Sequence, residues 1–317
     1  MPLINEKKFL TIRPCSFKLA WLNNFTMNKV ILITGCSSGF GMLTAARLAA
    51  RDHTIYATMR NLQKQDTLKL ELKQRDTKCQ ILHLDVTDDN SISKVINTID
   101  KQNGRLDVLI NNAGYGIGGF FEDLSEDEIR SQFETNFFGV QKVTRSALPL
   151  MRATASKAGK DFSTKIINIS SAQGRSTLPG LGAYGASKFA LEGFSESWFF
   201  ELQPFGIEVV ILEPGTYSTK AIDENSHEAD AGLKPDSPYA KYTQQLKNLH
   251  SNILITKKGV GEPEDVAIMI EDIINRKRNK LRYLAGTQAK IRVLMRTILP
   301  FSWFSRIINS FIMGSKN

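Results

Sequence analysis

A glycine-rich turn between an apolar run and a helical segment constrains this sequence most. The nine residues 33–41, ITGCSSGFG, contain three glycines, follow the apolar run 30–33 and precede a segment of helical period. Glycine has no Cβ, so the backbone can adopt positive φ and approach a ligand closely. Free N–H groups at the start of the next helix favour a diphosphate. The turn predicts a strand, a phosphate-binding loop and a helix, although a tight turn without ligand has the same glycines.

Strand-like and helix-like segments alternate along the rest of the chain. Short apolar or β-branched runs are separated by segments of helical period, which is the pattern of strand–helix units around a parallel sheet. We expect one doubly wound α/β domain, the Rossmann fold, over residues 27–287, with an N-terminal extension over 1–26 and a helical extension over 288–317. The expected strands span residues 29–34, 54–58, 79–84, 107–111, 164–170, 206–213 and 281–285.

The composition is that of a globular protein with a large core, since the 317 residues are 42% hydrophobic. Cys15, Cys36 and Cys79 lack metal-ligand spacing and indicate reduced thiols, so we expect a cytoplasmic location and no metal site. The net charge of +9 is concentrated at the chain ends, with ten basic and no acidic residues over 276–317. Because the middle of the chain is then acidic, no specific nucleic-acid partner is expected.

Two further segments have distinct compositions. The polar stretch from residue 216 to about 260, with Pro235 and Pro238, predicts a long mobile loop that covers the site. No stretch reaches the roughly 18 apolar residues that a membrane span needs. The tail repeats apolar residues at helical spacing between cations, first at Ile291, Leu294, Met295 and Ile298, and then at Phe304, Ile307, Ile308 and Phe311. Residues 290–317 are therefore expected either to contact an anionic membrane surface or to pack on the core or a second copy.

The end of the second predicted strand bears on the choice of nucleotide. A carboxylate at this place would bind a ribose 2′-hydroxyl, but the sequence has Met59 and Arg60 instead. A cation can pair with a 2′-phosphate, to which Ser38 of the glycine turn could also donate a hydrogen bond. The pattern favours NADP(H) over NAD(H), although a solvated arginine without a role would look the same.

A tyrosine, a lysine and a serine are the candidates for chemistry. Tyr184 and Lys188 are four residues apart in a helical segment, so they share one face, and a neighbouring ammonium would lower the pKa of a phenol. Ser170 and Ser171 end the fifth predicted strand, at the sheet edge where such folds bind ligands. A phenol and a hydroxyl there could exchange a proton with a substrate oxygen and hold that oxygen. A tyrosine–lysine pair on a helix surface is also common without any function.

The combination of motifs resembles the short-chain dehydrogenase/reductase family, and most closely its 17β-hydroxysteroid and retinol dehydrogenase branch. The resemblance extends over about residues 28–290, with the motifs in family order. They are TGCSSGFG at 34–41, LDVT at 84–87, NNAG at 111–114, NISS at 168–171, YGASK at 184–188 and EPG at 213–215.

This resemblance implies a role for each matching residue. Tyr184 would be the general acid/base, Lys188 would lower its pKa and bind the nicotinamide ribose, Ser171 would orient the carbonyl, and Asn136 would position a proton-relay water. Asp85 would accept a hydrogen bond from the adenine amino group, and Thr219 would contact the nicotinamide carboxamide. The full set of implied cofactor-binding residues is Thr34, Gly35, Ser37, Ser38, Gly39, Phe40, Gly41, Arg60, Asp85, Val86, Asn112, Ala113, Gly114, Tyr184, Lys188, Pro214, Gly215 and Thr219.

The implied reaction interconverts an alcohol and its ketone or aldehyde, with NADP(H) preferred and NAD(H) as the alternative cofactor. Ile117, Phe120, Phe121, Leu178 and Pro179 predict an apolar pocket wall, so the expected substrate is lipophilic, such as a steroid, a retinoid or a fatty carbonyl compound. A homodimer or homotetramer is expected. The alternative is a catalytically silent NADP(H)-binding regulator or scaffold on the same fold.

Overall fold

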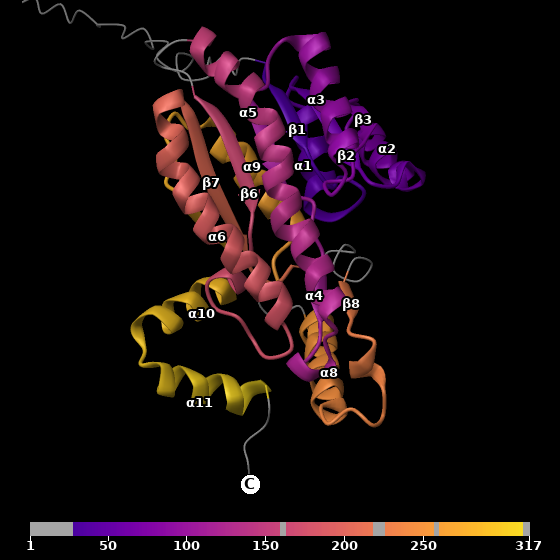
Figure 1. Ribbon diagram of the computed structural model, residues 1–317, viewed down its shortest axis with the longest axis vertical. Coiled ribbons are helices and arrows are strands. Elements are labelled where there is room, and N and C mark those ends of the chain that lie inside the picture. Colours follow the sequence, from indigo (N-terminus) through magenta and orange to yellow (C-terminus); the bar gives the residue numbers. More distant parts are fainter. Residues whose placement is uncertain (1–27, 159–162, 218–225, 257–259, 313–317) are drawn as a thin grey trace, which may run out of the picture.

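The computed structural model describes residues 28–158, 163–217, 226–256 and 260–312 (Figure 1). Its centre is a parallel sheet of seven strands in the order β3-β2-β1-β4-β6-β7-β9. These strands confirm the seven predicted from the sequence, with each boundary within one residue of the expected one. They span Val30–Ile33 (β1), Thr54–Met59 (β2), Gln80–His83 (β3), Val108–Asn111 (β4), Thr164–Ile169 (β6), Ile207–Pro214 (β7) and Arg282–Ala285 (β9).

Helices cover both faces of the sheet, which confirms the doubly wound fold. One buried cluster joins the sheet to α1, α2 and α9, and a second joins it to α3, α5 and α6. The helices span Gly39–Ala49 (α1), Gln65–Gln74 (α2), Asp89–Asn103 (α3), Glu126–Phe133 (α4), Gly139–Ala158 (α5), Gly182–Leu202 (α6), Ala240–Thr256 (α8), Pro263–Asn275 (α9), Thr287–Ile298 (α10) and Phe301–Ile312 (α11).

The order of the strands determines where a ligand binds. The chain moves outward through β1, β2 and β3 and then returns to the other side of β1 to form β4. Ligands of such sheets bind at the carboxyl edge, where this reversal opens a crevice between neighbouring strands. The glycine turn follows β1, and the NNAG motif begins at the end of β4, so both motifs lie at the crevice.

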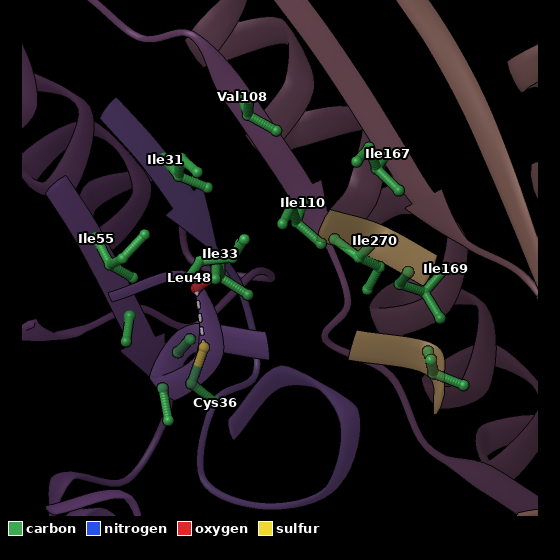
Figure 2. Close-up of a cluster of buried hydrophobic side chains, with 14 of the residues drawn as sticks. Ile31, Ile33, Cys36, Leu48, Ile55, Val108, Ile110, Ile167, Ile169 and Ile270 are labelled. Atoms are coloured by element: carbon green, nitrogen blue, oxygen red, sulfur yellow. Dashed lines mark hydrogen bonds between the residues drawn. The ribbon is translucent and has the colours of Figure 1, made fainter. Parts of the chain in front are cut away.

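The core of the sheet extends to the back of the glycine turn. Figure 2 shows Cys36, which lies in the turn itself, next to Ile33, while Ile31, Val108 and Ile110 lie further along the strands in the same buried cluster. The Cys36 thiol donates to the carbonyl oxygen of Ile33 over 3.4 Å. Burial raises the pKa of this thiol, which keeps it protonated at neutral pH. Cys36 therefore anchors the turn in the core.

The prediction of a long loop over residues 216–260 was wrong for much of this stretch. Residues 240–256 form α8, and residues 226–228 form a short strand, β8, parallel to β5 at Gly116–Gly118. Aromatic contacts hold the start of α8, because the Phe120 ring stacks on Tyr239 with 4.7 Å between centroids. The many polar side chains of this stretch, together with Pro235 and Pro238, led to the prediction of a loop.

Candidate active site

The glycine turn has the backbone conformation that its sequence predicts. Gly35 and Gly39 have φ of 73° and 57°, in the left-handed region that favours glycine. A Cβ on Gly35 would lie 2.7 Å from the Cα of Ala113, and one on Gly41 would collide with the Asn112 side chain and the Gly35 carbonyl oxygen. The turn is therefore a cradle that side chains would fill, which suits a diphosphate at the start of α1.

The end of β4 holds this turn in place. The Thr34 hydroxyl oxygen accepts hydrogen bonds from the backbone N–H groups of Asn112 and Ala113, both over 3.0 Å. The Asn112 amide donates to the carbonyl oxygens of Thr34 and Gly35, both over 2.9 Å. Thr34 and Asn112, which the sequence assigned to the cofactor, thus have a clear structural role in shaping its cradle.

Other residues assigned to the adenine end lie around the same edge of the sheet. Asp85 accepts hydrogen bonds from the backbone N–H and hydroxyl of Thr87, over 2.9 and 2.7 Å, and so stabilises a turn. Val86 is buried, and a Cβ on Gly139 would collide with it. Arg60 is exposed directly after β2, where its charge lowers the pKa of Tyr115 against the larger effect of burial.

The Phe40 ring faces the protein, with its centroid 5.4 Å from that of buried Tyr217 in an edge-to-face arrangement. This aromatic contact packs the start of α1 against the segment after β7. Ser38 stands at the N-cap position of α1, and Ser37 precedes it in the turn. Phe40 thus has a packing role, whereas the two serines lie within the glycine turn.

The structure brings Tyr184, Lys188 and Ser171 together at the carboxyl edge. Tyr184 and Lys188 lie on α6, with the Lys188 Nζ 5.8 Å from the centre of the Tyr184 ring. Ser171, just beyond β6, hydrogen-bonds to the Tyr184 phenol and accepts from the backbone N–H of Gln173 over 3.1 Å. The buried Lys188 Nζ donates to the carbonyl oxygen of Ile169 over 2.9 Å.

Asn136 joins the same group through a one-turn π-helix, Glu134–Phe138, an irregularity that often marks functional sites. Its amide donates to the carbonyl oxygen of Tyr115 over 2.8 Å and accepts from the Tyr115 N–H over 3.1 Å. A Cβ on Gly114 would lie 3.1 Å from the Asn136 Oδ1 and 3.7 Å from the Lys188 Nζ. Gly114 therefore leaves the space between the cradle and the catalytic candidates open.

The electrostatics of the pair differ from the expectation. Burial raises the pKa of the Tyr184 phenol, and the hydrogen bond from Ser171 acts in the opposite direction. Burial dominates because the loss of hydration disfavours the phenolate, and the expected effect of Lys188 on this pKa stays a prediction. Burial also lowers the pKa of Lys188 to about 8, while the negative charge of Glu192 raises it.

The segment after β7 closes the other side of the site. Pro214 ends β7, and a Cβ on Gly215 would lie 2.8 Å from the Cβ of Ala289 on α10. The sequence-predicted Thr219 lies outside the described residues. The EPG motif thus contributes to the contact between the sheet edge and the C-terminal helices.

The side chains of the predicted pocket wall differ in their exposure, and the wall itself stays a prediction. Ile117 and Phe120 are buried, but the Phe120 ring stacks on the Tyr239 ring. Phe121 is 82% exposed, so its side chain points to solvent, because it begins a short 3₁₀ turn on the surface. Leu178 and Pro179 lie just before Gly180, whose carbonyl oxygen accepts from the Gly119 N–H over 2.8 Å.

Sequence reasoning missed a buried charge network beneath Lys188. Arg282 on β9 donates to Glu192 on α6 over 2.9 Å and lies 3.5 Å from Glu213 on β7, which also accepts from Arg175 over 3.1 Å. Burial raises the pKa of Glu213 to about 7, and the Glu192 charge adds to this effect. The available signal was Glu192, four residues after Lys188, together with the glutamate of the EPG motif.

Comparisons with known proteins agree with this geometry. A family model described as short chain dehydrogenase matches residues 29–230. The uncharacterized oxidoreductase YusZ of Bacillus subtilis is 38% identical over 284 residues, covering 88% of this chain and 97% of its own. A 3-ketodihydrosphingosine reductase of Bacteroides thetaiotaomicron is 36% identical, covering 83% and 90%. Bovine retinol dehydrogenase 8 is 33% identical, covering 86% of both chains.

Solved structures share the fold of this chain. A short-chain dehydrogenase from Streptomyces avermitilis superposes with a TM-score of 0.72 at 32% identity, covering 89% of this chain and 97% of its own. ElxO, solved with NADP bound, superposes with a TM-score of 0.64 at 26% identity, covering 82% and 97%.

Proposed function

Because the chain belongs to the short-chain dehydrogenase/reductase family and is an NAD(P)-dependent oxidoreductase, we propose that it reduces a lipophilic ketone or aldehyde with NADPH, with Tyr184 as proton donor. The membership favours an enzyme over the silent regulator or scaffold that the sequence left as an alternative. The observation that carries the proposal is the convergence of Tyr184, Ser171, Lys188 and Asn136 beside the glycine cradle.

The residues present suit a nicotinamide dinucleotide. Its diphosphate would be held by the turn at Gly35–Gly41, where missing side chains expose the backbone N–H groups at the start of α1. Gly114, between this cradle and Lys188, leaves room at the other end of the site. When bound, the nicotinamide would supply the hydride that reduces the carbonyl carbon.

Each catalytic side chain then has a separate task. The Tyr184 phenol gives its proton to the substrate oxygen as that oxygen gains negative charge. The Ser171 hydroxyl, beside the phenol, turns its single hydrogen to the same substrate oxygen and orients that oxygen. The charged Lys188 stabilises the phenolate that remains, and Asn136 keeps the Tyr115 backbone beside the site.

The charge states support reduction as the working direction. Burial keeps the Tyr184 phenol protonated at neutral pH, as a proton donor requires. The lipophilic substrate is supported by buried Ile117 and by two relatives whose names indicate a ketosphingoid base and a retinoid as their own substrates. A cytoplasmic location, assembly into a dimer or tetramer, and the boundaries 27–287 and 288–317 remain predictions.

A substrate panel tests the proposal. Full-length protein with NADPH is given steroid, retinoid, long-chain acyl and short water-soluble ketones or aldehydes, and oxidation of NADPH is followed by absorbance. Turnover should be fastest with a lipophilic compound, because binding removes its apolar surface from water against the apolar side chains of the proposed pocket. Tight NADPH binding with no turnover of any carbonyl compound would contradict the proposal and favour the silent regulator.

Arg60 should determine the choice of nucleotide. Replacing it with alanine should raise the Kd for NADPH about tenfold to a hundredfold and leave the Kd for NADH unchanged, since a charge-assisted bond to the 2′-phosphate is lost. Fluorescence titration with both nucleotides measures this. Lys78→Ala is the matched control, because Lys78 is an exposed cation before β3, at the opposite edge of the sheet. Equal losses for NADH and NADPH would contradict the role of Arg60.

A further inference from the structure

The two C-terminal helices lie beyond the carboxyl edge of the sheet, and α10 packs on the segments that follow Ser171 and β7. Figure 1 shows α10 and α11 as an arm below the sheet, across from α8. Ala289 and Val293 of α10 pack on Ala172, which follows Ser171, and Ala289 also meets Gly215. The inner face of α10 is therefore fixed next to the catalytic edge.

The outer surface of this arm is apolar. The sequence predicted an apolar stripe at Ile291, Leu294, Met295 and Ile298. All of these except half-buried Met295 are exposed, and Ala289 and Val293 form the buried contact instead. The helix α11 buries Phe304 and continues the exposed surface beyond Pro300. We call the exposed apolar side chains of these two helices the apolar arm face; they are Ile291, Leu294, Ile298, Phe301, Trp303 and Ile307. Ile291, Leu294 and Ile298 share one side of α10, and Trp303 and Ile307 share one side of α11.

Cations surround the apolar arm face. Lys290, Arg296 and Arg306 are exposed on the same two helices, and no acidic residue occurs between Arg276 and Asn317. The Arg296 guanidinium lies 5.2 Å from the centre of the Phe301 ring, so its charge is at the border of the apolar surface. Exposed apolar and indole side chains bordered by lysine and arginine are the chemistry that binds the surface of an anionic bilayer.

We propose that the apolar arm face docks on the surface of a membrane that contains anionic lipids. A second copy of the chain is a poorer occupant, since a two-fold contact would bring the same cations together without an acidic partner on these helices. Docking is peripheral: no helix in the described ranges is long and apolar enough to cross a bilayer. Because α10 also contacts the segments after Ser171 and β7, a docked membrane lies next to the site, and this consequence rests on the proposed function.

Vesicle sedimentation tests the proposal with the full-length protein. Vesicles of phosphatidylcholine with about one third phosphatidylserine should bind at least about fivefold more protein than vesicles of phosphatidylcholine alone. Leu294→Glu should lower the bound fraction at least about fivefold, because it places a negative charge in the centre of the apolar face. Leu70→Glu is the matched control, as Leu70 on α2 is 57% exposed and Leu294 is 58% exposed.

Ketone reduction and the mass of the assembly, measured for the same three proteins, distinguish the possible outcomes. All three proteins should reduce a short water-soluble ketone equally, which shows that the variants are folded. Equal vesicle binding by Leu294→Glu and Leu70→Glu, or none by the unmodified protein, would overturn the docking surface. A smaller assembly of Leu294→Glu in sedimentation velocity, together with no vesicle binding, would overturn it in favour of a second copy. Vesicle binding without turnover of any carbonyl compound would support docking and overturn the proposed function alone.

Discussion

Replacing Tyr184 with phenylalanine should lower kcat for carbonyl reduction about 10²- to 10⁴-fold, the range expected when a general acid is removed. The ring is retained, so packing on α6 and the Kd for NADPH should change little. Loss in kcat with an unchanged Kd would assign the phenol hydroxyl to the chemical step. Steady-state kinetics and NADPH fluorescence titration give the two quantities.

Tyr283→Phe is the matched control for this variant. The Tyr283 hydroxyl donates to the Asn279 side chain over 2.9 Å at the opposite end of β9, away from the site. Its kcat should therefore remain within about twofold of the unmodified protein, because a single surface-near hydrogen bond contributes only about 1 kcal/mol to folding. Equal kcat values for Tyr184→Phe and Tyr283→Phe would remove Tyr184 from the mechanism.

The pH profile is a second readout of the same site. The pKa of Lys188 is lowered to about 8 by burial, so the ammonium is present below this pH and lost above it. A neutral Lys188 no longer stabilises the phenolate that Tyr184 becomes after giving up its proton. The kcat of reduction should therefore fall as the pH rises through about 8. A rate that rises over this interval would contradict the charge assigned to Lys188.

The sequence predicted the sheet well because its strands are buried on both faces. Runs such as Val30–Ile33 and Val108–Asn111 are almost continuously apolar, and this pattern can be recognised from the sequence without knowing which strands lie beside them. The catalytic candidates were also found, since Tyr184 and Lys188 share a helical face and Ser171 follows a strand end. Both the strands and the catalytic candidates can therefore be recognised from the spacing of residues within short segments.

Features that depend on distant contacts were missed. The helix α8 is polar along its sequence, and the stack of Phe120 on Tyr239 joins residues far apart in the chain. The upward pKa shift of Tyr184 was missed for a similar reason, because the burial that causes it comes from the whole site and not from neighbours in the sequence. In the tail, helical spacing revealed an apolar stripe but not which face of α10 the core would cover.

Gly41→Ala should disrupt the cofactor cradle. A Cβ at this position collides with the Asn112 amide and with the carbonyl oxygen of Gly35, and Asn112 is the residue that bonds to the turn. The backbone must shift, which should cost about 1–3 kcal/mol of unfolding free energy. The Kd for NADPH should rise about tenfold to a hundredfold, as misplaced N–H groups no longer converge on the diphosphate.

The control for this variant is Gly193→Ala on α6, where a Cβ would meet no atom within 4 Å. Because alanine favours a helix over glycine by about 1 kcal/mol, this variant should be slightly more stable and bind NADPH normally. Urea unfolding and NADPH titration compare the two. The ratio of the Kd for NADH to the Kd for NADPH is the most informative quantity. Because both nucleotides contain the diphosphate, Gly41→Ala should weaken the binding of both equally. Arg60→Ala, in contrast, should weaken the binding of NADPH alone. Normal affinity in Gly41→Ala would show that the diphosphate is not held by this turn.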